Sequence, residues 1–224
     1  MSIYLDFNAT TPLESSVVGD IVTSLNVHWG NPSSCHRYGR VAKTSIEKAR
    51  KNLSKMIHGM EEDIIFTSGG TEANNMVIYS ALETYRRWKA ESEGEITISK
   101  PHYIATNVEH DATNLPLKHL ENRGDIEVSF VPVGPNGCVD TDDIISSVKA
   151  NTCLITVMFA NNETGVVMPI ADIGRQVRKI NQERKKRKLF RILYHTDAAQ
   201  AIGKIPVNVD ETMVDYLTVV GHKV

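Results

Sequence analysis

The chain has 224 residues, of which 41% are hydrophobic and 23% are charged, and its formal net charge is −2. This length suffices for one large domain, and the composition is ordinary for a globular protein in water. The sequence excludes the basic field of a nucleic-acid-binding protein, a membrane-spanning apolar stretch and an N-terminal secretion signal, so we predict a cytoplasmic protein.

The N-terminal part is predicted to be an extended arm followed by two helices. The arm covers residues 1–15, because Pro12 keeps the residue before it out of the helical conformation. Apolar residues recur at helical spacing over residues 15–27 and again over 38–58. We expect the large domain to cover residues 16–224.

From residue 63 onward, short apolar runs alternate with amphipathic stretches. Residues 63–67 form the first predicted strand, a tight turn and a helix over 71–90 follow, and the polar residues 91–101 are predicted to form a loop. A second long helix is predicted over 170–186. The other predicted strands cover residues 102–107, 127–133, 153–158, 191–196 and 216–220. This alternation indicates an α/β fold with a mainly parallel sheet flanked by helices.

Two further features are read from residue types alone. The three cysteines, Cys35, Cys138 and Cys153, are odd in number and widely spaced, which argues against a disulfide framework or a zinc cluster. A reducing compartment is the simplest interpretation. The basic run at 183–188 is interpreted as the solvated end of a helix and not as a nucleic-acid-binding patch.

Polar groups gather where the predicted strands end. Ligands bind at the carboxyl ends of the strands in an open α/β sheet, so these groups are the candidates for a functional site. They lie in five segments, residues 67–71, 107–110, 161–165, 195–200 and 221–223.

The first segment admits two interpretations. Gly69 and Gly70 allow a close backbone approach, and Thr71 opens a helix whose free amide groups and dipole favour an anion such as a phosphate. The same residues are also typical of a helix cap with an acid, Glu72, in the first turn.

Asp197 and Gln200 follow an apolar strand. A carboxylate at such a strand end needs a partner, because burying it unpaired is costly. A pyridinium nitrogen would be one partner, and the amide groups of a helix N-terminus would be another. Gln200 could donate to a phenolate oxygen or complete a capping box with Asp197.

His110, Asn162 and Lys223 complete the candidates. An imidazole can stack on a flat ring or move protons, although a lone histidine is more often an ordinary surface residue. Asn162 is typical of a turn. Lys223 follows a strongly apolar strand, where a desolvated amine becomes a nucleophile suited to imine formation, unless it is a solvated chain end.

Together these residues form one complete set: a phosphate cradle, a ring-stacking histidine, an acid for a ring nitrogen and a lysine for a carbonyl. A protein has to supply these groups to pyridoxal phosphate. The sequence therefore predicts a pyridoxal-phosphate site. A dinucleotide-binding domain is the weaker interpretation, because no Gly-x-Gly-x-x-Gly motif follows a predicted strand.

In this order the motifs resemble the NifS-like branch of the class V aminotransferases, a branch of cysteine desulfurases and selenocysteine lyases with the fold type I large domain. The matching segments are residues 4–12, 30–34, 66–72, 109–110, 161–165, 195–200 and 221–223. Within the branch the sequence looks most like the selenocysteine lyases, because Met168 and Pro169 match and Val220 stands where desulfurases usually have a serine.

The resemblance implies a role for each candidate. Lys223 would hold pyridoxal phosphate as a Schiff base and then move the α-proton of the substrate. His110 would stack on the ring, and Asp197 would keep the ring nitrogen protonated. The other implied contacts are those of Asn162 and Gln200 with the ring, and of Gly70, Thr71 and His222 with the phosphate. No metal is implied.

The implied reaction is the removal of selenium from L-selenocysteine, which leaves L-alanine and passes selenium to a reduced acceptor. Family members are homodimers, and a selenium acceptor protein is a further expected partner. The alternatives are a cysteine desulfurase that takes sulfur from L-cysteine, and a non-catalytic truncated product that binds the full-length enzyme.

The family's C-terminal small domain is expected to be absent, because the chain stops at Val224, directly after a core strand and Lys223. In the family, a cysteine on a later loop takes the chalcogen, and none of the three cysteines lies in its motif. We therefore expect this chain by itself to be inactive and to fold poorly, with an uncovered sheet edge.

Overall fold

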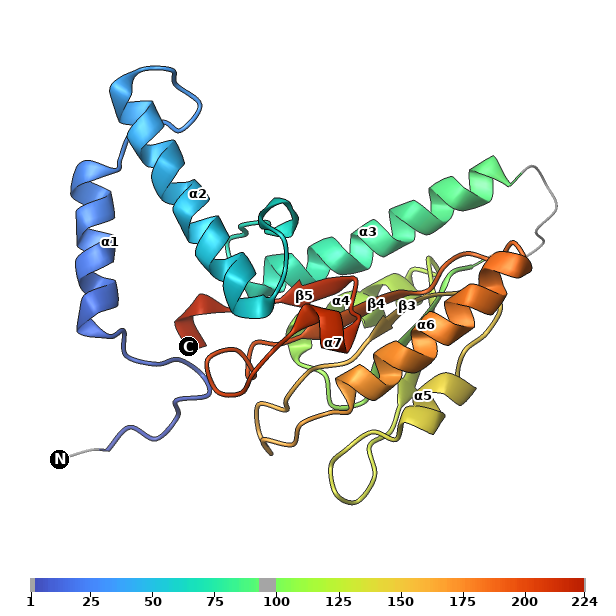
Figure 1. Cartoon of the computed structure of the whole chain (residues 1–224). Coiled ribbons are helices and arrows are strands. Elements are labelled where there is room, and N and C mark those ends of the chain that lie inside the picture. Colours follow the sequence, from blue (N-terminus) through green and yellow to red (C-terminus); the bar gives the residue numbers. More distant parts are fainter. Residues whose placement is uncertain (1–2, 93–99, 224) are drawn as a thin grey trace. The chain divides into compact units, whose positions relative to one another are not determined.

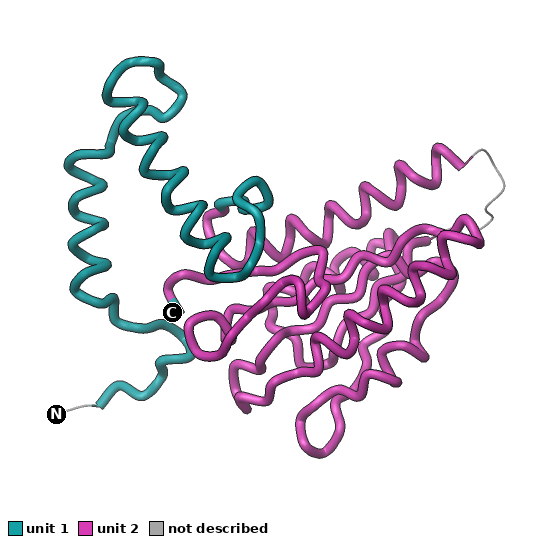
Figure 2. The backbone as a smooth tube through the Cα atoms, in the orientation of Figure 1, with its two compact units in different colours: residues 1–66, 223 teal, residues 67–222, 224 magenta. Residues whose placement is uncertain are grey.

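The computed structural model describes residues 3–92 and 100–223, so the predicted loop at 91–101 lies largely outside the described residues. The chain divides into two compact units, one of residues 1–66 with Lys223 and one of residues 67–222 (Figure 2). The predicted arm belongs to the first unit, and its separation from a domain that begins at residue 16 stays a prediction. None of the helices described is both long enough and apolar enough to cross a membrane.

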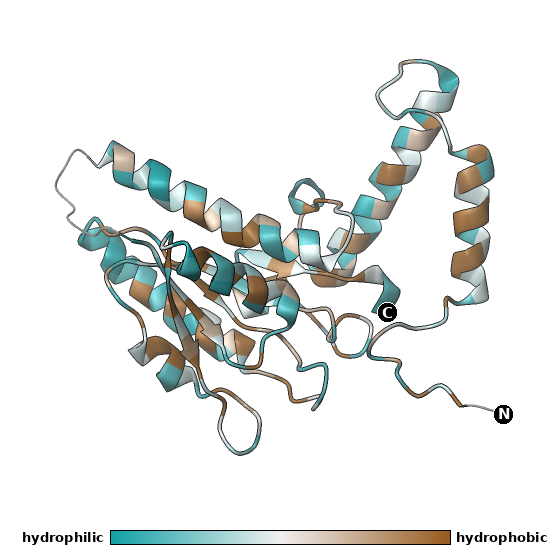
Figure 3. Cartoon of the chain, turned by 180° about the vertical axis from the view of Figure 1, so that it is seen from behind, coloured by the Kyte–Doolittle hydropathy of each residue, from teal (hydrophilic) through white to brown (hydrophobic). Residues whose placement is uncertain are grey.

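The first unit contains two long helices, as predicted. They are α1 (Ser15–Val27) and α2 (Arg37–Ile57), followed by the 3-10 turn η1 (Glu61–Asp63) (Figure 1). The apolar face predicted for α1 exists (Figure 3), but none of its side chains is buried. Its members are 43–71% exposed: Val17, Val18, Ile21, Val22 and Leu25.

The predicted strand at 63–67 is wrong. Ile64 has an extended backbone, but residues 64–67 pair with no strand among the described residues. The carbonyl of Ile64 instead accepts a hydrogen bond from the Arg50 guanidinium, which also lies 5.0 Å from the centre of the Phe66 ring. An apolar, β-branched run favours the extended conformation, but a strand also needs a neighbouring strand for its backbone groups.

The second unit is an α/β domain with one parallel sheet, which confirms the predicted fold class (Figure 1). The strand order is β2-β1-β3-β4-β5, and every neighbouring pair is parallel. The strands are β1 (His102–Thr106), β2 (Glu127–Val131), β3 (Thr152–Thr156), β4 (Leu193–Asp197) and β5 (Tyr216–Thr218). All residues of β1, β3 and β4 are buried, as expected of parallel strands covered on both faces.

Two long helices cover the opposite faces of this sheet. They are α3 (Gly70–Glu91) and α6 (Ile170–Lys186), both close to their predicted bounds. The hydroxyl of Tyr103 donates to the carbonyl of Ile78 in α3 at 2.9 Å, whereas that of Tyr194 donates to the carbonyl of Ile170 at 3.0 Å. Tyr103 pairs with Leu154 and Tyr194 with Ile155, so the two tyrosines point to opposite faces.

Three short helices were not predicted. They are α4 (Asp111–Asn122), α5 (Thr141–Ser146) and α7 (Val209–Thr212). The helix α4 contains Pro116, which removes a backbone hydrogen bond and argues against a helix at the level of sequence. Burial outweighs this cost, because Leu117 and Leu120 are at most 1% exposed and pack into the core.

The interpretation of the basic run at 183–188 is wrong at one residue. Arg184 is only 5% exposed, and its guanidinium donates to four backbone carbonyls at 2.7–3.0 Å. The acceptors are the carbonyls of Lys149, Ala150, Thr152 and Phe190. Arg184 therefore ties the end of α6 to the segments that precede β3 and β4, while the other residues of the run are exposed.

Candidate functional site

The candidate residues of the second unit collect at one edge of the sheet. Because the strands are parallel, the segments that follow β1, β3, β4 and β5 leave from the same edge. The start of α3 lies at this edge too. A Cβ atom added to Gly70 would lie 2.7 Å from Val220 Cγ2 and 3.9 Å from Thr218 Cγ2, and Thr218 is the partner of Asp197 in the β4–β5 register.

Asp197 is the best-fixed group of the site. It ends β4 and is 7% exposed. Its Oδ1 accepts from the backbone N–H of Ala199 at 3.0 Å, and its Oδ2 accepts from the side-chain amide of Asn74 at 2.8 Å. No helix follows, so the carboxylate caps a turn and not a helix N-terminus. Each oxygen keeps a lone pair for a further donor.

The turn before α3 has features of both interpretations considered above. Gly69 occupies the N-cap position and supplies no side-chain cap. Glu72 lies in the first turn, and its carboxylate accepts from the backbone N–H of Ser68 at 2.5 Å. Hydrogen bonding from the side chain of Ser68, together with this backbone hydrogen bond, lowers the pKa of Glu72. The first amide groups of α3 therefore have no side-chain cap, although an acid lies beside them.

His110 lies at the N-cap position of α4 and is exposed. Its Nδ1 accepts from the backbone N–H of Ala112 at 3.0 Å, so the neutral ring carries its proton on Nε2. The capping bond holds the ring by one nitrogen and leaves its faces available for stacking. The sequence interpretation of His110 as an ordinary surface residue is therefore incomplete, because the side chain has a structural task.

The other candidates lie in the turns and ends of the same segments. Asn162 is half-buried and follows Asn161, whose amide donates to the carbonyl of Val108 at 3.3 Å and so joins this turn to the segment before His110. Gln200 is 8% exposed, and its Oε1 accepts from Lys204 at 2.5 Å. His222 and Lys223 lie in the 3-10 turn η2 (Gly221–Lys223).

Glu109, the residue before His110, is a buried acid for which the sequence predicts no separate role. It is 5% exposed, and its Oε1 accepts from the Thr106 hydroxyl at 2.6 Å and from the backbone N–H of Met158 at 2.9 Å. Its Oε2 is buried without a partner in the described structure. Burial raises the pKa of Glu109 to about 8, so the acid is largely protonated at neutral pH.

Replacing Glu109 with Gln is expected to remove a loss of stability that occurs as the pH rises from about 4.5 to about 8. The folded pKa of about 8 lies above the unfolded value of 4.5, so folding holds a proton that the unfolded chain releases. Stability falls as pH rises through this window. The free energy of unfolding is measured by urea titration at pH 6 and at pH 8. Between these two pH values, the unchanged protein should lose about 2 kcal/mol more stability than Glu109→Gln.

The matched control is Glu83→Gln, on the exposed side of α3. It should follow the unchanged protein at every pH. Parallel pH profiles for Glu109→Gln and the unchanged protein would contradict the protonated state of Glu109.

His195 belongs to the core and not to the site. It is fully buried, and its ring nitrogens contact the hydroxyls of Thr156 at 2.8 Å and Thr218 at 3.1 Å. Burial lowers the pKa of His195 to about 4, so the ring is neutral. It links β3, β4 and β5 across the sheet.

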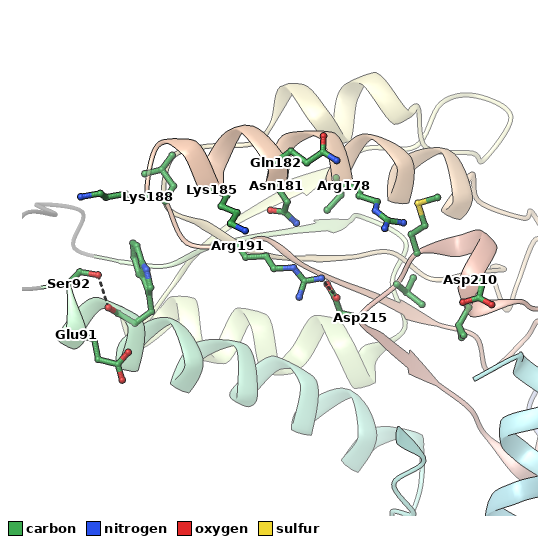
Figure 4. A pocket seen from close by; sticks show the side chains of 16 residues that line it. Glu91, Ser92, Arg178, Asn181, Gln182, Lys185, Lys188, Arg191, Asp210 and Asp215 are labelled. Atoms are coloured by element: carbon green, nitrogen blue, oxygen red, sulfur yellow. Dashed lines mark hydrogen bonds and ion pairs between the residues drawn. The ribbon is translucent and has the colours of Figure 1, made fainter. Parts of the chain in front are cut away.

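One pocket of the second unit contains none of the candidate residues. Its volume is about 960 Å³, and it lies between α3 and α6 (Figure 4). Arg191 and Asp215 form an ion pair in it, and both precede strands, so it opens at the amino ends of β4 and β5. Ligand chemistry is expected at the opposite ends. We therefore assign the site from its side chains and not from the pocket.

Two buried polar residues of the site were missed at the level of sequence. Asn74 is completely buried in α3, and Thr113 is completely buried in α4. A signal was present for Asn74, since it continues the buried stripe of Val77, Ile78 and Ala81 at helical spacing. A lone amide on such a stripe needs a partner inside the protein.

The parallel sheet with its polar carboxyl edge defines an α/β protein of the kind that binds ligands at that edge. The chain belongs to the aminotransferase class-V family, which matches residues 3–224.

The relatives that it resembles are of two kinds. It is 49% identical over 223 residues to the selenocysteine lyase of Xenopus laevis, and the matching region covers 99% of this chain and 52% of that protein. It is 41% identical over 221 residues to the cysteine desulfurase IscS of Dictyoglomus turgidum, with 99% of this chain and 50% of that protein covered. A solved NifS-like protein superimposes with a TM-score of 0.86 at 33% identity, over 100% of this chain and 56% of that one. The chain spans about half the length of the curated relatives it matches.

Proposed function

We propose that the chain forms the cofactor-binding part of a pyridoxal-phosphate-dependent selenocysteine lyase. The enzyme would remove selenium from L-selenocysteine, release L-alanine and transfer the selenium to a reduced acceptor, which supplies the two electrons. The observation that carries the proposal is the buried carboxylate of Asp197, fixed by two donors at the carboxyl edge of the sheet. Identity with selenocysteine lyases is also higher than with cysteine desulfurases, 49% against 41%.

The donor set fits pyridoxal phosphate. The Asp197 oxygens keep lone pairs that suit a protonated ring nitrogen. A side chain at position 70 would meet Val220, which explains the glycine, and the amide groups of the first turn of α3, which have no side-chain cap, suit a phosphate. When bound, the cofactor supplies an electron sink for the bonds at the α-carbon of the substrate.

The residues of the chain then have separate tasks. Asp197 holds a proton on the ring nitrogen, and the amine of Lys223 binds the cofactor and moves the α-proton. His110 stacks on the ring with the face that its capping bond leaves available. Asn162 and Gln200 orient the ring, whereas Gly70, Thr71 and His222 bind the phosphate.

The wider setting is part of the same proposal. The enzyme would act in the cytosol as a homodimer, with L-selenocysteine as substrate and a selenium acceptor protein as partner. The large domain would begin at residue 16, after the arm of residues 1–15. A cysteine desulfurase that takes sulfur from L-cysteine is the second candidate, favoured by the identity with desulfurases over the same residues.

Borohydride trapping tests the proposal. Pyridoxal phosphate is added to the purified chain, the complex is reduced, and the modified lysine is mapped by mass spectrometry. We expect one modified lysine, Lys223, because the proposed site presents the carbonyl of the bound cofactor to this amine alone, whereas solvent-exposed lysines meet only free cofactor. The variant Lys223→Ala should lose this label.

The lysines of the exposed basic run serve as internal controls, since Lys185 and Lys188 should stay unmodified. Labelling spread over surface lysines, or label that persists in Lys223→Ala, would contradict the assignment of Lys223.

A further inference from the structure

Asn74 connects the three elements that carry the candidate site. Its side-chain amide donates one hydrogen bond to Asp197 Oδ2 at 2.8 Å and one to Thr113 Oγ1 at 3.1 Å. Asn74 lies four residues after Gly70 in α3, Thr113 lies three residues after His110 in α4, and Asp197 ends β4. A single buried amide therefore touches the elements that bear the phosphate turn, the stacking ring and the ring-nitrogen acid.

The orientation of this amide is determined by its partners. The amide nitrogen has two N–H donors, and both are used. The reversed orientation would place the amide oxygen against the carboxylate of Asp197, which is repulsive. Asn74 is completely buried, and its Oδ1 has no partner in the described structure. A buried polar atom without a partner lowers the free energy of unfolding, so stability alone does not explain an amide at this position.

We propose that Asn74 is the positioning residue of the cofactor acid, with Thr113 as its own support. This inference rests on the proposed function and names how its central carboxylate is held. Asn74 fixes the direction of Asp197 Oδ2 through an N–H···O hydrogen bond of 2.8 Å to the carboxylate, so that the lone pairs that remain on this oxygen keep one direction. Thr113 prevents the amide from turning away from Asp197.

A double-mutant cycle tests the contact without any cofactor. Urea midpoints are measured for the unchanged chain, Asn74→Leu, Asp197→Ala and the double variant. Leu matches Asn in size, so the cycle isolates the amide–carboxylate contact. We expect Asn74→Leu to lower the midpoint in the unchanged chain and to have a clearly smaller effect when residue 197 is Ala. Equal shifts in both backgrounds would overturn the inference.

Cofactor binding gives the second readout. Asn74→Leu should raise the equilibrium dissociation constant for pyridoxal phosphate by about 10- to 100-fold, as expected for a lost hydrogen bond to a charged group. It should also change the visible circular dichroism of the bound cofactor, which reports the orientation of the ring. Thr113→Val, which removes only the hydroxyl, should shift both quantities in the same direction, and Thr113→Ser should restore them.

Asn26→Leu is the matched control, because the amide of Asn26 donates to a backbone carbonyl, that of Val22, on the exposed surface of α1. It should bind pyridoxal phosphate as the unchanged chain does. Unchanged affinity and dichroism in Asn74→Leu would overturn the inference while the proposed function stands. Failure of the unchanged chain to bind the cofactor would instead count against the proposed function, and the cycle would still decide whether Asn74 holds Asp197.

Discussion

Replacing Asp197 with Asn is expected to slow the exchange of the α-hydrogen of L-alanine with solvent deuterium by about 10²- to 10³-fold, the effect of removing one group that stabilises the developing charge. Exchange at the α-carbon needs the electron sink and a base, but no chalcogen-accepting cysteine. It therefore tests the residues of this chain directly. The exchange is followed by proton NMR of the chain loaded with pyridoxal phosphate.

The structure gives a second reason for a large effect. Asp197 accepts one hydrogen bond at each oxygen, from Asn74 and from the backbone N–H of Ala199. Asn at this position can accept only one of them, because its second terminal atom is an N–H donor. In either orientation of the Asn amide, its N–H groups face another N–H donor. The variant therefore loses both the charge and the fixed orientation of the group that is proposed to face the ring.

A matched control is Asp210→Asn, which changes an exposed acid near the amino ends of the strands. Its exchange rate should stay within twofold of that of the unchanged chain. An exchange rate for Asp197→Asn within tenfold of the unchanged chain would contradict the role given to Asp197.

Replacing Arg184 with Ala is expected to lower the free energy of unfolding by about 3–5 kcal/mol, because buried carbonyls that lose a charged donor cost about 1–3 kcal/mol each and water replaces part of the loss. Arg184 is the donor to four backbone carbonyls, and it is 5% exposed. Its removal leaves those acceptors without the donors that they have now. Urea unfolding of the chain measures the loss.

Two variants separate the hydrogen bonds from the charge. Lys185→Ala changes the adjacent, exposed residue of the same run and should stay within about 0.5 kcal/mol of the unchanged chain. Arg184→Lys keeps the charge but lacks the planar fork of donors, so we expect an intermediate loss. A loss below about 1 kcal/mol in Arg184→Ala would show that water replaces the guanidinium without cost.

Several elements of the fold follow from local patterns. The helix at 170–186 has the bounds that its apolar stripe predicts, and the two helices of the first unit begin and end within a residue of their predicted positions. The five strands of the sheet were all located from short apolar runs between polar segments. These patterns are readable because side chains repeat every 3.6 residues in helices and every two in strands.

Local patterns fail where the deciding contact is distant in the chain. The run 63–67 has strand composition, yet no strand pairs with it among the described residues. The helix α4 forms in spite of Pro116, because Leu117 and Leu120 are buried in the core. The residue composition of a segment favours helix or strand by at most a few kcal/mol. The free energy of strand pairing or of side-chain burial can exceed this preference.

The fold class, the family resemblance and the residue types at the carboxyl edge of the sheet follow from the order of the amino acids alone. Which of those residues are held in place, and by which partners, depends on how the domain packs. Asn74 lies 123 residues from Asp197 along the chain, and Glu109 lies 49 residues from Met158. By its position in a basic run Arg184 resembles a solvated residue, but in the fold its guanidinium donates to carbonyls of two other segments, residues 149–152 and Phe190. The physical reason is that a buried polar group is defined by its partners, and the partners are chosen by the packing of the whole domain.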